Sequence, residues 1–159
     1  MQDSLKRTAA FAAILSALYA AHEIGDHWVQ TDHQARAKGR RGEQQRAGQL
    51  SCARHVAGVT ATKAAMLAIT CKTLGLKLRP GRTAAALALD AATHYWADRR
   101  YTLEALAELC GKGEYFRLGL PREGHDDNKT IGSGRFALDQ TFPRTMLWAA
   151  ALIIAGGTE

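Results

Sequence analysis

Two stretches of the chain place imidazole and carboxylate side chains at helical spacing. His22 and Asp26 lie four residues apart in HEIGDHWVQ, and Asp90, His94 and Asp98 repeat that spacing in DAATHYWAD. Side chains four residues apart lie on the same face of an α-helix. Because this face otherwise carries apolar residues, we expect these groups to be buried, where a carboxylate without a partner costs several kcal/mol.

A divalent metal ion is the simplest compensation for such a buried polar group. His55 and Asp139 also fall on apolar faces of two further predicted helices. Mixed His and Asp ligands suit Mn, Fe, Zn or Mg, and the three cysteines do not form the pairs that are typical of structural zinc sites. We therefore predict a divalent metal site with six candidate ligands: His22, Asp26, His55, Asp90, His94 and Asp139.

The elements that must position these groups are predicted to be helices. Ala, Leu and Met recur at spacings of three and four, and β-branched runs are scarce. We expect a single helical domain over residues 1–159, all-α, built as an up-down-up-down four-helix bundle with a short extra helix. The main helices are predicted at residues 4–30, 49–74, 83–100 and 136–155, and the short one between Thr102 and Gly111.

In a bundle of this topology, the six candidate ligands all fall at the same end. Two segments, residues 31–48 and 101–135, connect the helices at that end and are predicted to form a lid. Residues 111–135 contain six glycines and one proline, which predicts a long glycine-rich loop. Residues 39–48 are predicted to be a basic loop, and Pro80-Gly81 is predicted to separate the second and third helices.

The predicted reaction is hydrolysis of a phosphate-containing substrate. A bound divalent ion lowers the pKa of a coordinated water and polarises a phosphoryl oxygen. The net charge of +6 and the arginines and lysines near the site suit a small anionic substrate. Asp98 or a metal-bound water is the candidate for proton transfer. The candidate substrate contacts are Gln30, Arg99, Lys112, Asp126 and Asn128.

Other interpretations of these features stay open. The buried polar groups could form a hydrogen-bond network that only specifies packing, in a non-enzymatic membrane-associated or partner-binding helical protein. Nucleic-acid binding through residues 36–46 is a third alternative. The longest uncharged runs, residues 8–21 and 145–158, are shorter than the roughly 20 apolar residues that span a bilayer. We therefore expect a cytoplasmic protein that can associate with the inner face of the membrane.

Several motifs of the chain resemble those of a bacterial family known as domain of unknown function 3307. They are HEIGDHWVQTDHQARAKG, CARHVAG, DAATHYWADRR, GKGEYFRLG with HDDN, and FALDQ, in that order, and they cover nearly the whole chain. The resemblance implies a small helical protein, often membrane-associated, without an established activity. It assigns nine positions to the family's polar signature: His22, Asp26, Gln30, His55, Asp90, His94, Asp98, Asp139 and Gln140.

The resemblance has two further consequences. Gln140 joins the candidate substrate contacts. Pro143 stands where the family's signature continues to a histidine, which implies that one ligand or general base of the family is missing here. A proline also clashes with the carbonyl four residues earlier in a helix, so we expect a kink or a helix start at Pro143.

Overall fold

The computed structural model describes residues 2–120 and 132–157, and all regular structure in them is helical. The all-α prediction is therefore confirmed for this part of the chain. In order, the elements are α1 (Gln2–Ile24), the π-helix η1 (Gly25–Val29), α2 (Asp32–Ala37), the 3₁₀-helix η2 (Gly42–Gln44), α3 (Gln45–Leu74), α4 (Pro80–Asp98), α5 (Tyr101–Leu109), α6 (Gly113–Arg117) and α7 (Ser133–Ala155).

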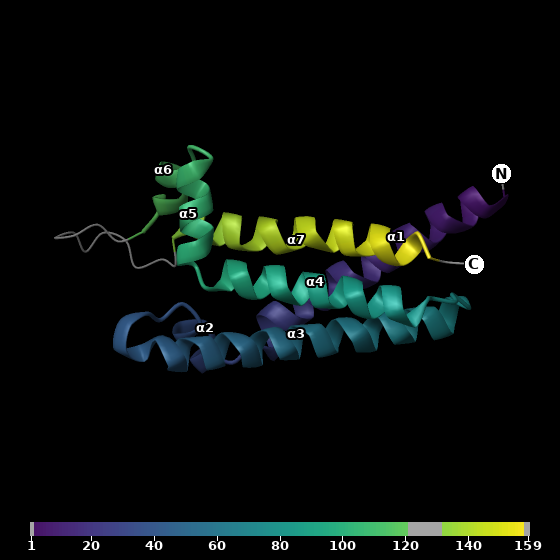
Figure 1. The fold of residues 1–159 in the computed structure, drawn as a ribbon, viewed down its shortest axis with the longest axis horizontal. Coiled ribbons are helices and arrows are strands. Elements are labelled where there is room, and N and C mark those ends of the chain that lie inside the picture. Colours follow the sequence, from purple (N-terminus) through teal and green to yellow (C-terminus); the bar gives the residue numbers. More distant parts are fainter. Residues whose placement is uncertain (1, 121–131, 158–159) are drawn as a thin grey trace.

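Four long helices carry the fold. α1 packs on α3 and α7, and α4 also packs on α3 and α7, so the four helices form a closed ring of contacts. α5 and α6 lie beside the start of α7, at the opposite end of the molecule from the two termini (Figure 1). α2 lies against the start of α3 at this same end (Figure 1).

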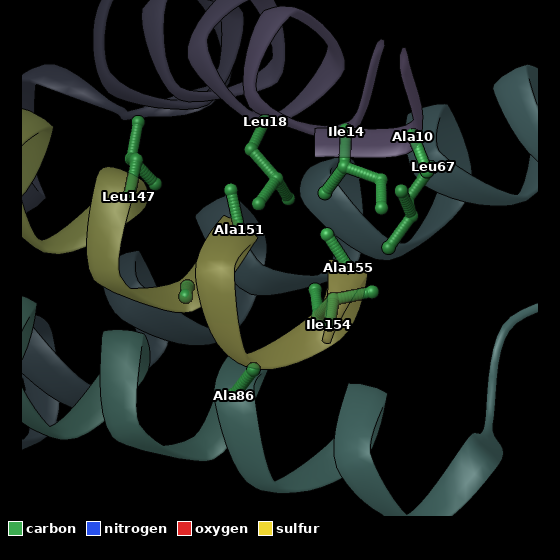
Figure 2. Close-up of a cluster of buried hydrophobic side chains, with 10 residues drawn as sticks. Ala10, Ile14, Leu18, Leu67, Ala86, Leu147, Ala151, Ile154 and Ala155 are labelled. Carbon is green, nitrogen blue, oxygen red and sulfur yellow. The ribbon is translucent and has the colours of Figure 1, made fainter. Parts of the chain in front are cut away.

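The half of the molecule near the termini has an apolar core. Figure 2 shows side chains from all four long helices meeting there, with Leu18, Leu147 and Ile154 among the largest. Many of the others are alanines, which let helix backbones approach closely. Fully burying one Leu or Ile side chain stabilises a fold by roughly 1.5–3 kcal/mol. The core comprises Ala10, Ile14, Leu18, Leu67, Ala86, Leu147, Ala150, Ala151, Ile154 and Ala155.

Three predicted boundaries differ from the structure. α4 begins at Pro80, because a proline lacks only an N–H that the first turn of a helix leaves unpaired. α3 begins at Gln45 rather than at residue 49, so it takes up part of the predicted basic loop. A short helix, α6, lies within the segment predicted to be an irregular glycine-rich loop.

Pro143 lies inside α7, which is continuous from Ser133 to Ala155. The alternative of a helix start at this residue is therefore wrong. Pro143 is buried and has no N–H to offer to the carbonyl of Asp139, so this carbonyl lacks its usual donor from the helix. α7 continues through Pro143 despite this missing backbone hydrogen bond.

Candidate metal centre

The other half of the molecule, toward α2 and α5, has a polar core. Asp26 comes from the π-helix that follows α1, His55 from the first half of α3, and His94 and Asp98 from the last turns of α4. All four side chains are buried. The structure thus brings together residues that are far apart in the sequence.

The π-helix shapes the backbone around Asp26. Such wide turns are rare and occur often at functional sites. Gly25 opens this turn and lies directly against α3, because a Cβ atom there would come within 3.0 Å of the Val59 Cα. A glycine at this position therefore lets Asp26 approach His55 closely.

The ligand atoms of these residues converge. His55 Nε2 lies 3.0 Å from Asp26 Oδ1 and 3.1 Å from Asp98 Oδ2. His94 Nε2 lies 3.6 Å and 3.5 Å from the same two oxygens. His55 Nε2, Asp26 Oδ1 and Asp98 Oδ2 are nevertheless buried without a partner in hydrogen-bond geometry. Two carboxylate oxygens and two imidazole nitrogens therefore lie close together in one buried cluster.

These separations fit the donor atoms around a metal ion. Nitrogen and oxygen ligands at 2.0–2.2 Å from an ion lie roughly 3.0 Å apart in octahedral and 3.3–3.6 Å apart in tetrahedral coordination. Asp26, His55 and His94 each offer one ligand atom, and these three atoms lie within 4.8 Å of one another. These residues could therefore hold a metal ion. Asp98 lies beside both imidazoles but outside this group of three.

The charges in this region depend on one another. Burial opposes the ionisation of Asp98, but Lys38 and His55 outweigh it and lower its pKa to about 2. Burial also disfavours the imidazolium of His55, but the carboxylates of Asp26 and Asp98 raise its pKa. A proton and a metal ion would therefore compete for the same position, as is general for sites with histidine ligands.

Two buried lysines neutralise the carboxylates of Asp98 and Asp90. Lys38 Nζ lies 2.7 Å from Asp98 Oδ1, and Lys63 Nζ lies 2.6 Å from Asp90 Oδ2. Asp90, a predicted metal ligand, thus has a lysine partner and is not in the Asp26, His55 and His94 group. The sequence prediction missed both lysines. Lys63 lies eight residues after His55, on the same helix face, and this spacing could have revealed it.

Two arginines at the end of α4 tie the segment around α2 to the site. Arg99 is buried and donates to the carbonyls of Lys38 at 2.6 Å and Arg40 at 2.8 Å. Arg100 donates to the carbonyl of Ala35 at 2.8 Å. The predicted substrate contact Arg99 therefore has backbone partners in the structure. Through Lys38, this segment is also joined directly to Asp98.

Arg100 has an unusual backbone conformation. Its φ of 61° and ψ of −50°, with a hydrogen bond of 2.7 Å from the Tyr101 N–H to the Arg99 carbonyl, define a strained γ-turn. Among the described residues other than glycine, it alone has a positive φ. Such strain occurs preferentially at functional sites.

A cavity of about 460 Å³ opens beside the candidate metal ligands. Its volume is in the range of small-molecule binding sites. Asp26 borders both the cavity and the group of three ligands, so a molecule in the cavity could reach an ion held there. The polar residues that line it include Asp26, Gln30, Asp139 and Gln140, together with four cationic side chains, Arg36, Lys38, Arg100 and Arg135.

The remaining predicted residues differ in their placement. Gln140 Nε2 donates to Asp26 Oδ2 at 2.7 Å, and Asp139 lines the cavity with a buried Oδ1 that has no hydrogen-bond partner. The ring of His22 lies 5.2 Å from that of His94. Lys112 lines a separate apolar cavity between α5 and α7. Asp126 and Asn128 lie outside the described residues.

Asp139 is the carboxylate that resists ionisation most clearly. Burial raises its pKa to about 6, and the nearby charge of Asp98 adds to this effect. Burial likewise lowers the pKa of His22 to about 3, with a further contribution from Lys63. Neither residue belongs to the group of three ligand atoms.

No family model, curated protein or solved structure matches this chain.

Proposed function

We propose that the protein is a metal-dependent hydrolase that acts on a phosphate-containing substrate. The observation that carries this proposal is the convergence of one ligand atom each from Asp26, His55 and His94 in a buried site. We also propose that the four long helices form an up-down-up-down bundle, with the metal site at one end and the glycine-rich segment over it. The ion is divalent, of the Mn, Fe, Zn or Mg class that His and Asp ligands suit.

The residues around the site support a division of roles. A bound divalent ion would polarise a phosphoryl oxygen and favour the ionisation of a coordinated water. Hydrolysis would add a water oxygen to phosphorus, break the phosphorus–oxygen bond to the leaving group, and transfer a proton from that water to the departing oxygen. Asp98 is the candidate for proton transfer, since its Oδ2 lies 3.1–3.5 Å from both imidazole nitrogens. Gln30 and Gln140 line the cavity where the substrate would bind.

The metal content of purified protein tests the proposal directly. We expect about one divalent ion per chain in the wild type after overnight dialysis, and a loss of most of it in His94→Ala and Asp26→Asn. His33→Ala is the matched control, because His33 is an exposed residue on α2. Elemental analysis of folded protein gives the readout. Equal metal content in the wild type and His94→Ala would rule the metal site out.

A second function is favoured by a specific feature of the outer surface. In residues 8–22, 55–71, 83–98 and 145–157, every Asp, Lys and His side chain is buried. The exposed residues there include Ile69, Leu89, Trp148 and Leu152. The described residues also include one helix, Gln2–Val29, that is long and apolar enough to cross a membrane, a property shared by core helices and signal sequences. We therefore retain a non-enzymatic, membrane-associated or partner-binding protein as the alternative.

Basic residues lie where this uncharged surface ends. Lys6, Arg7, Lys72 and Arg82 flank it at the end of the helices opposite the metal site. Such residues suit the anionic lipids of the cytoplasmic leaflet, so the proposed location is the cytoplasm, at the inner face of the membrane. A protein that stays in the membrane fraction after a high-salt wash and carries no metal would favour the alternative. A soluble protein with stoichiometric metal would favour the hydrolase.

A further inference from the structure

Two arginines face the cavity beside the metal site from different elements. Arg100 comes from the γ-turn between α4 and α5, and Arg135 comes from the first turn of α7. Both are half-buried. Burial lowers the pKa of Arg135, and the positive charge of Arg100 lowers it further, while Asp139 and Glu104 act in the opposite direction. The two guanidinium groups therefore line one cavity within range of each other's charge, and an anion bound between them would reduce their repulsion.

The other two cations of the cavity are placed differently. Lys38 is held by Asp98 at 2.7 Å, and its ammonium group is buried. Arg36 is mostly exposed and lies 3.8 Å from Asp32 on the outer surface of α2. Among the four cations that line the cavity, Arg100 and Arg135 are the half-buried pair, while Asp26 connects this cavity to the candidate metal ligands.

The backbone around Arg100 supports a dedicated role for this pair. The strained γ-turn places Arg100 where one of its N–H groups donates to the Ala35 carbonyl and the side chain borders the cavity. A guanidinium has five N–H donors, so the bond to Ala35 leaves others to bind a ligand. Planar guanidinium groups bind phosphate oxygens with two parallel hydrogen bonds, which makes arginine well suited to phosphate recognition.

We propose that Arg100 and Arg135 form an anion subsite that binds the phosphoryl group of a small phosphomonoester. The phosphoryl group of a monoester carries nearly two negative charges at neutral pH, which two guanidinium groups match, whereas a diester carries one. The cavity of about 460 Å³ leaves room for a small organic group. The hydrolytic role of this subsite rests on the proposed function, but its affinity for phosphate does not.

Titration calorimetry with inorganic phosphate tests the subsite in the full-length protein. Measurements on EDTA-treated protein separate the arginine pair from any bound metal. We expect Arg135→Gln to weaken phosphate binding roughly tenfold or more, because it removes hydrogen bonds to a charged group. Arg135→Lys should lose less, since it keeps the charge. Arg54→Gln is the matched control, because Arg54 is an exposed arginine of α3 that does not line the cavity.

The ester class is tested with methyl phosphate and dimethyl phosphate at pH 7.5. We expect the monoester to bind more tightly in the wild type, and Arg135→Gln to remove most of this preference. Equal affinity for the two esters would contradict the substrate class. If Arg135→Gln fails to fold by circular dichroism, Arg135→Lys and Arg100→Lys replace it, each with an expected loss of affinity for phosphate.

The subsite and the metal site can fail separately. Phosphate binding that is equal in the wild type and the arginine variants, or equally weakened in Arg54→Gln, would overturn the subsite. So would a wild-type protein that holds metal but does not bind phosphate at millimolar concentration. Phosphate binding that depends on Arg135 in a protein without metal would support the subsite and contradict the hydrolase.

Discussion

The same four helices build two cores of opposite character. Toward the termini, α1 contributes Ile14 and Leu18 to an apolar cluster, and α4 contributes Ala86 (Figure 2). One to three turns further on, α1 contributes His22 and the following π-helix Asp26, while α4 contributes Asp90, His94 and Asp98. The change occurs within single helices, so it reflects the side chains and not a change of architecture.

The two cores make different contributions to stability. Apolar side chains stabilise the fold wherever they are buried together, because the hydrophobic effect has no preferred direction. Buried ionic groups stabilise it only when each has a partner, and removing one partner leaves the other uncompensated. We infer that the apolar core supplies most of the stability that allows the polar core to hold its carboxylates and imidazoles close together.

The buried pair of Lys63 and Asp90 gives the largest expected effect on stability. Both side chains are nearly inaccessible, and their charged atoms are 2.6 Å apart. We expect Lys63→Met to lower the free energy of unfolding by about 3–5 kcal/mol, because it leaves a buried carboxylate without a cation. The double variant Lys63→Met, Asp90→Leu should recover most of this loss. Urea denaturation gives the free energies, and a double variant as unstable as the single one would contradict this account.

The sequence predicted much of the polar core because of its spacing. His22 and Asp26, and Asp90, His94 and Asp98, repeat at four residues within apolar stretches, which determines a shared face before any helix is packed. The helical class and the approximate positions of the long helices followed from the same periodicity. The spacing of residues within one helix does not determine the distance between side chains on different helices. It therefore could not show that Asp90 has Lys63 as its partner or that Asp98 has Lys38.

Local geometry also lay beyond the sequence. Pro80-Gly81 was predicted to separate two helices, and Pro143 to give a kink or a helix start, but Pro80 occupies the first position of α4 and Pro143 lies within the continuous α7. Tertiary packing decides which outcome holds, because a proline costs little at the start of a helix and more inside it. The cavity arginine Arg135 was missed for a related reason, since residue 135 was expected to lie in a loop.

The apolar core provides the next largest effect. Leu147 is fully buried in α7 among Ile14, Leu18 and Ala151 (Figure 2). We expect Leu147→Ala to lower the free energy of unfolding by about 2–5 kcal/mol, through lost burial and a new cavity. Leu152→Ala on the same helix is the control, because Leu152 is 45% exposed and should lose less than about 1 kcal/mol. Metal content per folded chain should stay at the wild-type value in both, and a loss of metal in Leu147→Ala would show that the two cores are not independent.

The smallest expected effect is the dependence of stability on pH that arises from His22. Burial, together with Lys63, lowers the pKa of this imidazole to about 3 in the folded protein. Between pH 6.5 and 3 the unfolded chain therefore binds a proton at His22 that the folded chain does not, so stability falls as the pH is lowered through this window. The slope is at most about 1.4 kcal/mol per pH unit for one group.

Comparing the wild type with a His22 variant between pH 6 and 5 isolates this contribution in EDTA-treated protein. Asp139, whose raised pKa of about 6 makes stability rise as the pH falls through this range, contributes equally to both proteins. The carboxylates of Asp26 and Asp98 have pKa values lowered by folding, so they lose stability mainly as the pH falls below about 5. The pKa of His55 is raised, so its contribution changes mainly above pH 6.5. Relative to the wild type, His22→Leu should thus change the slope of the unfolding free energy between pH 6 and 5 by about 1 kcal/mol per pH unit, toward greater stability at pH 5. His33→Ala, at an exposed site, should leave the slope unchanged. An equal slope in the wild type and His22→Leu would mean that the buried imidazole is protonated in the folded state, and that the polar core already contains a compensating anion at this position.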